Sequence, residues 1–101
     1  MKDYSFEEVI SMLEHDEDIY VSSAIQLLAK YHMGYSASLK LITARKNHVC
    51  WLVRCAVAWA LGQYPKRNQL AQHTLTNMVI NDVHSDVRHA AADALFYSNR
   101  G

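Results

Sequence analysis

The sequence predicts an all-α fold in which three helix pairs stack into a short solenoid. Two stretches 34 residues apart share one pattern, Val53-Arg-Cys-Ala-Val-Ala-Trp-Ala-Leu-Gly62 and Val87-Arg-His-Ala-Ala-Ala-Asp-Ala-Leu-Phe96. In both copies Val, Ala, Ala and Leu recur at i, i+3, i+7 and i+8, which places them on one face of a helix. A repeat period of about 20 to 50 residues is typical of stacked helical repeats.

The composition supports the same fold class. The chain has 101 residues, half of them apolar, with one Pro and three Gly. This is enough for one domain with a modest core, and it leaves little material for hairpin turns. The net charge is zero, but residues 1–20 hold seven acids against one base, and residues 21–81 hold seven bases and no acid.

Each helix has a recognisable start or stop signal. The helices are expected at residues 5–14, 18–31, 36–46, 48–62, 67–80 and 84–97, which pair into repeats at about 5–31, 36–63 and 67–97 of a single domain. Ser5 followed by Glu8 predicts a capping box for the first helix. Ser36 or Ser38 is expected to cap the third helix, and Gly62 is expected to end the fourth as a C-cap.

The links between the helices repeat as well. Three link residues, each five positions before the Val of the pattern, are Asp16, His48 and Asp82. The first pair carries a weaker copy of the pattern, with Val21, Ala24 and Leu28 in place but Ser22 where the later copies have Arg. The constant spacing predicts that all three pairs are built in the same way.

Residues 82–95, with residues 53–62 as a second copy, resemble the HEAT-like repeat of the phycobilisome lyase type. The pattern of that type is an Asp, a short link, and then Val-Arg-x-x-Ala-x-x-Ala-Leu-Gly. The resemblance implies a right-handed solenoid in which the second helix of each pair lines a concave side. Such repeats bury their apolar faces by stacking on one another.

The resemblance also implies a role for the Arg that follows Val. In this family it commonly supports packing between repeats through an acid in the preceding link. Arg54 is therefore expected to reach the acids at 16–18, whereas Arg88 is expected to face His48, which offers no acid.

A ridge of side chains is expected on the exposed side of the second helices. Helical geometry places Ile19, Ser23, Leu27 and Tyr31 there, with Trp51, Cys55, Trp59, Ser85, His89, Asp93 and Tyr97 at equivalent positions. Each Trp either folds onto neighbouring helices or forms a recognition surface, since exposed Trp residues anchor protein interfaces. The expected partner-binding residues are Tyr31, Trp51, Arg54, Cys55, Trp59, Arg88, His89, Asp93 and Tyr97.

The favoured function is a non-catalytic protein-binding module, such as an adaptor, an inhibitor or an immunity-type protein. Two HEAT-repeat enzymes are similar in part. Deoxyhypusine hydroxylase holds iron with His-Glu pairs, but Ala90 follows His89 here, and the alkylpurine DNA glycosylases need about twice as many repeats. No catalytic arrangement, cofactor motif or set of residues with metal-ligand spacing is apparent, so no enzyme, cofactor or metal is expected.

The alternative function is nucleic-acid binding through the acid-free middle of the chain. Its contact residues would be Arg45, Lys46, Arg54, Lys66 and Arg67. A cluster of basic residues on one face is the usual electrostatic footprint of such proteins.

The remaining expectations concern location and assembly. The acidic N-terminus does not resemble a secretory signal, and the apolar run 49–62 is too short to span a bilayer, so a cytoplasmic protein is expected. Cys50 and Cys55 point in different directions and are expected to stay free thiols. The first and last helices have no evident polar cap, which suggests that the ends of the solenoid associate with a second copy.

Overall fold

Six helices follow one another in the computed structural model, which describes the main chain of residues 4–100 and the side chains of residues 4–98. They are α1 (Phe6–Leu13), α2 (Asp18–Tyr31), α3 (Ser36–Thr43), α4 (Trp51–Gly62), α5 (Gln69–Asn81) and α6 (Ser85–Arg100). Every predicted helix is present, and no described residue is in a strand. Residues 1–3, at the start of the acidic segment, lie outside the described residues.

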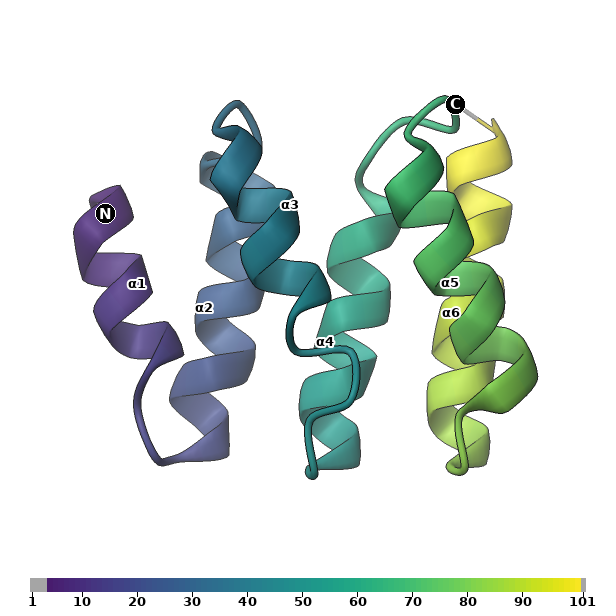
Figure 1. The fold of residues 1–101 in the computed structure, drawn as a ribbon, viewed down its shortest axis with the longest axis horizontal. Helices are drawn as coiled ribbons and strands as arrows, with labels where there is room; N and C mark the ends of the chain where they lie inside the picture. The colour runs from purple at the N-terminus through teal and green to yellow at the C-terminus, as the bar shows by residue number, and fades with distance from the viewer. Residues whose placement is uncertain (1–3, 101) are drawn as a thin grey trace.

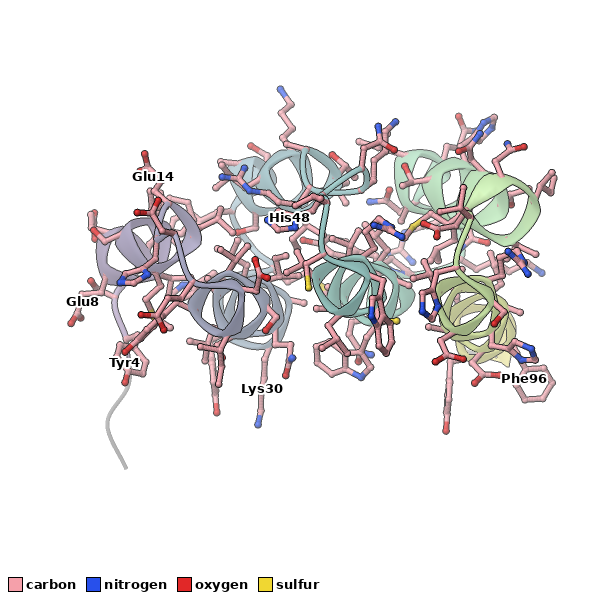
Figure 2. The ribbon with its side chains drawn as sticks, turned by 90° about the horizontal axis from the view of Figure 1, so that it is seen from below. Tyr4, Glu8, Glu14, Lys30, His48 and Phe96 are labelled. Atoms are coloured by element: carbon pink, nitrogen blue, oxygen red, sulfur yellow. The ribbon has the colours of Figure 1, made fainter. Side chains whose placement is uncertain are left out.

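The helices form two layers. Figure 1 shows α2, α4 and α6 side by side and running in the same direction, with α3 and α5 running the opposite way. Seen end-on, α3 and α5 cover one face of this row, and α1 lies beside α2 at its end (Figure 2). The predicted all-α solenoid is therefore confirmed.

The repeated pattern forms the centre of the core. Val21, Val53 and Val87, which occupy the same position in α2, α4 and α6, are at most 4% exposed. The core is one continuous cluster that takes residues from all six helices. Since burying one Val or Leu side chain contributes about 1.5–3 kcal/mol, this shared face holds the row together.

Gly62 has a different role from the predicted one. It is the last residue of α4, and no described glycine has a positive φ, so it does not form a left-handed C-cap. A Cβ at this position would lie 2.8 Å from the Cβ of Ala94. Gly62 therefore permits close contact between α4 and α6, and the C-cap prediction is wrong.

The capping predictions differ in outcome. The capping box is confirmed, because the Glu8 N–H donates to Ser5 Oγ and the Ser5 N–H donates to Glu8 Oε1. The prediction for α3 is wrong. This helix begins after Tyr35 without a side-chain cap, and the buried Ser38 instead donates to the carbonyl oxygen of His32 at 2.6 Å. A buried hydroxyl needs a partner, and the nearest one is this carbonyl.

Candidate functional site

One face of the α2–α4–α6 row points away from α3 and α5, and we call it the open face. By helical position and by the lining of its hollows, this face comprises Ile19, Ser23, Leu27, Lys30 and Tyr31 of α2, Trp51, Cys55 and Trp59 of α4, Gln63 directly after α4, and Ser85, His89, Asp93 and Tyr97 of α6. Figure 2 shows the labelled Lys30 projecting from this face, on the side opposite α3 and α5. Large apolar side chains are exposed here, with Ile19 and Tyr97 both 68% exposed. Exposed apolar side chains that gather on one face indicate an interaction surface.

Trp59 lies at the centre of the open face. Its side chain is 43% exposed and borders three separate hollows. The larger two are the α2/α4 hollow, of about 920 Å³, and the α4/α6 hollow, of about 620 Å³. A partly exposed Trp that lines two hollows is suited to anchor an interface, because it offers apolar surface to a partner's side chains in either hollow.

The α2/α4 hollow has an aromatic and aliphatic wall. It is lined by Tyr4, Met12, Ile19, Tyr20, Leu27 and Tyr31, among others. Lys30 is its one charged lining residue, and its Nζ lies 5.3 Å from the centre of the Tyr31 ring. Tyr4 precedes α1 and Met12 lies in it. The sequence pattern did not predict these two residues, because it places only the second helix of each pair on this face.

The α4/α6 hollow is smaller and carries the opposite charge. Besides Asp93, its lining residues are Trp59, Gly62, Gln63, Ala90, Ala94 and Tyr97. Asp93 is its one charged lining residue. The predicted residues Tyr31, Trp59, Asp93 and Tyr97 thus come together on the open face, whereas Lys30 and Gln63 were not anticipated as part of it.

Trp51 is placed differently from Trp59. It is half-buried and stacks on the imidazole of His84, with ring centroids 4.2 Å apart and an angle of 11° between the rings. His84 comes from the link before α6, so Trp51 joins neighbouring repeats. Trp51 therefore packs onto the neighbouring repeat, but onto its link and not onto one of its helices.

Arg54 does not lie on the open face. Its guanidinium donates two hydrogen bonds to the Asp82 carboxylate, from Nε at 2.9 Å and from Nη2 at 3.2 Å. The side chains of Arg54 and Asp82 are only 11% and 6% exposed. The expected contact with the acids at 16–18 is therefore wrong, because the arginine reaches forward to the α5–α6 link of the next repeat instead of back to the preceding one.

The environment of Asp82 fixes its charge. Burial alone would raise the pKa of this carboxyl, but the hydrogen bonds from Arg54 and from the main-chain N–H of His84, together with their charges, lower it below its ordinary value. Asp82 is therefore ionised at neutral pH. The pair is a structural clamp between the second and third repeats.

Arg88 repeats the geometry of Arg54 only in part. Each arginine donates from Nη1 to the carbonyl oxygen six residues earlier, at 2.7 Å, which is His48 for Arg54 and Asp82 for Arg88. No described carboxylate forms an ion pair with Arg88. The expected position opposite His48 is wrong, since Arg88 contacts its own link.

The other predicted contact residues are accessible to different degrees. His89 and Asp93 are exposed on α6, and Cys55 is half-buried between Trp51 and Trp59 along α4. Burial, and then the negative charges of Asp86 and Asp82, raise the pKa of the Cys55 thiol. Cys50 and Cys55 are both free, as predicted.

Three of the six histidines support the links. In each link that leads into α2, α4 or α6, a histidine Nδ1 accepts a hydrogen bond from the N–H two residues further on: His15 at 3.1 Å, His48 at 3.0 Å and His84 at 3.1 Å. Within the part of the chain that the structure describes, no three His, Cys, Asp or Glu side chains gather to hold a metal ion. These three histidines thus have a local structural role.

The basic residues of the alternative function are divided. Arg45, Lys46 and Arg54 lie near the start of α4, whereas Lys66 and Arg67 lie in the loop beyond its end (Figure 1). Even Arg54, the fourth residue of α4, is separated from this loop by eight residues of helix, roughly 12 Å. Because Arg54 is also neutralised by Asp82, these five residues do not form one basic patch.

The row of parallel helices, covered on one side and open on the other, defines the class of α-helical repeat proteins. The family model for HEAT repeats matches residues 6–95. The chain therefore belongs to the HEAT-repeat family, whose members generally serve as protein-interaction modules. No curated protein and no solved structure matches it. None of the described helices has the length and apolar character needed to cross a membrane.

Proposed function

We propose that this chain is a non-catalytic protein-binding module whose contact surface is the open face, with Trp59 as its central anchor. The observation that carries the proposal is the position of Trp59 between the two large hollows. Helical-repeat proteins use such extended surfaces for binding. The repeated Val-Arg pattern supports the phycobilisome lyase type of HEAT repeat. We further propose that the protein acts in the cytoplasm as an adaptor, an inhibitor or an immunity-type protein.

The open face also has the composition of an interface. Tyr, Trp and Met are enriched at the centres of protein interfaces, and the two large hollows are lined by residues of these kinds. Only two charged residues line them, so a partner removes few charges from water when it binds. Tyr31 and Tyr97 extend the apolar surface on either side of Trp59.

The test compares Trp59→Ala with Leu70→Ala. Leu70 is a suitable control because it is 46% exposed, close to the 43% of Trp59, but belongs to α5 on the other layer. Lysate of the native host is treated with nuclease and passed over each immobilised variant, and the retained proteins are quantified by mass spectrometry. Loss of a central Trp should weaken binding by about 2 kcal/mol or more, roughly 30-fold, whereas Leu70→Ala should bind like wild type.

The same experiment distinguishes protein binding from the alternative function, nucleic-acid binding. A partner that Trp59→Ala retains as well as wild type, with both proteins folded by circular dichroism, contradicts the proposal. Retention only without nuclease, weakened steeply by salt, favours nucleic-acid binding, because phosphate contacts release counterions.

A further inference from the structure

We propose that the open face binds a peptide segment in which an acidic and a basic side chain stand in a fixed order around an apolar centre. The acidic side chain lies over the α2/α4 hollow and the basic one over the α4/α6 hollow, and the apolar side chains contact both sides of Trp59. This inference rests on the proposed function, since it assumes that the open face is the contact surface. It goes further by stating the chemistry and the orientation of the partner.

The order of acid and base in the peptide follows from the charges of the two hollows, each of which is lined by one charged residue. Lys30 is the one charged residue that lines the α2/α4 hollow, and Asp93 is the one that lines the α4/α6 hollow. Neither side chain forms an ion pair with another described residue, so both remain available to a partner. Between them lie Trp59 and Gln63, which are uncharged and border both hollows.

The spacing sets the length of the segment. Lys30 and Asp93 are on α2 and α6, which are separated by α4. Neighbouring helix axes lie about 8–10 Å apart, so the two charged positions are roughly 16–20 Å apart across the row. An extended chain covers this distance in about six residues, and a helix needs about twelve. A segment of 16 residues is long enough in either form.

The charges and the aromatic anchor have different effects. Lys30 and Asp93 are exposed, and an exposed ion pair changes affinity by only about 1.5- to 5-fold, or about 2- to 3-fold near the middle of that range. Two such pairs favour one orientation by roughly 5- to 10-fold in affinity over the peptide with the reversed charge order. Trp59 supplies most of the affinity and does not distinguish the two orders.

The experiment is a selection from a displayed library of random 16-residue peptides. The library is selected separately against wild type, the charge-exchange variant Lys30→Glu/Asp93→Lys, and Trp59→Ala, each confirmed as folded by circular dichroism. We expect wild type to enrich peptides with one order of acid and base around an apolar centre, and the charge-exchange variant to enrich the opposite order. Synthetic peptides of both orders, measured by fluorescence anisotropy, should differ in Kd by roughly 5- to 10-fold, and the preference should invert in the exchange variant.

The experiment distinguishes failure of this inference from failure of the proposed function. Peptides that bind wild type and lose affinity for Trp59→Ala, but show no preferred charge order, overturn this inference and leave the proposed function standing. A preferred order that persists in the charge-exchange variant also overturns it. If no enriched peptide depends on Trp59, the open face is not the contact surface, and both proposals fail.

Discussion

The clamp between Arg54 and Asp82 gives the sharpest test of how the repeats are joined, because the chain contains a matched control. Arg54→Ala removes two hydrogen bonds to Asp82, one to the carbonyl of His48 and a longer one, of 3.2 Å, to the carbonyl of Val49. Arg88→Ala removes the equivalent carbonyl bond but no contact with a carboxylate. The difference between the two variants therefore reports chiefly the ion pair, with a smaller part from the exposed bond to Val49.

The magnitude follows from the burial of the pair. Arg54→Ala leaves the carboxylate of Asp82, 6% exposed, with the N–H of His84 as its remaining hydrogen-bond donor. Breaking a buried pair by removing one partner costs about 3–5 kcal/mol. Arg88→Ala should cost about 1.5–3 kcal/mol, the range for a hydrogen bond from a charged donor. We expect the free energies of unfolding to differ by about 2 kcal/mol.

The assay is urea unfolding at neutral pH, followed by circular dichroism. With an m-value of about 1.5 kcal/mol per molar, the midpoints of the two variants should differ by roughly 1 M or more. Asp82→Asn added to Arg54→Ala should recover part of the loss, because it removes the unpaired charge and keeps an oxygen for the His84 N–H. Midpoints that coincide would refute the conclusion that the ion pair joins the repeats.

Three further predictions concern single contacts. Because the pKa of Asp82 is lowered on folding, the stability that its carboxylate contributes is present above about pH 4 and is lost as the pH falls through the folded-state pKa. The urea-midpoint gap between wild type and Asp82→Asn should therefore shrink below pH 4, and a pH-independent gap would contradict this. Gly62→Ala should destabilise the protein by about 1–2 kcal/mol, because the new methyl group meets Ala94, whereas Gly34→Ala, with no atom within 4 Å, should be neutral or gain about 0.5 kcal/mol in thermal unfolding. Ser38→Ala should lower the free energy of unfolding by about 1 kcal/mol, since it removes a buried hydrogen bond of 2.6 Å, and an unchanged value would mean that this bond adds nothing.

The fold could be predicted from the sequence because one pattern encodes it twice. The Val positions at 53 and 87 repeat with their links, and both side chains are fully buried. Local signals were less reliable where packing decides the outcome. Gly62 has the sequence features of a helix stop, but the structure requires a glycine there because Ala94 packs against it. Ala94 lies 32 residues further along the chain, so the local sequence did not reveal this contact.

The open face could be predicted only in outline. Helical spacing placed Trp51 and Trp59 on the same side of α4 but did not distinguish them, because His84, which covers Trp51, belongs to another link. Arg54 was assigned to the wrong acids for the same reason, since its contact depends on how repeats stack. Lys30 was missed because the lining of a hollow depends on both helices that enclose it.

The central claim is that a partner binds the open face, and the most direct measurement is a titration of the isotope-labelled protein with the best peptide from the library, followed by ¹H–¹⁵N NMR. We expect the chemical-shift changes to gather around Trp59 and its indole N–H, Tyr31 and Tyr97, with α3 and α5 little affected. Changes concentrated on α3 and α5, with the signals of the open face unmoved, would contradict the account.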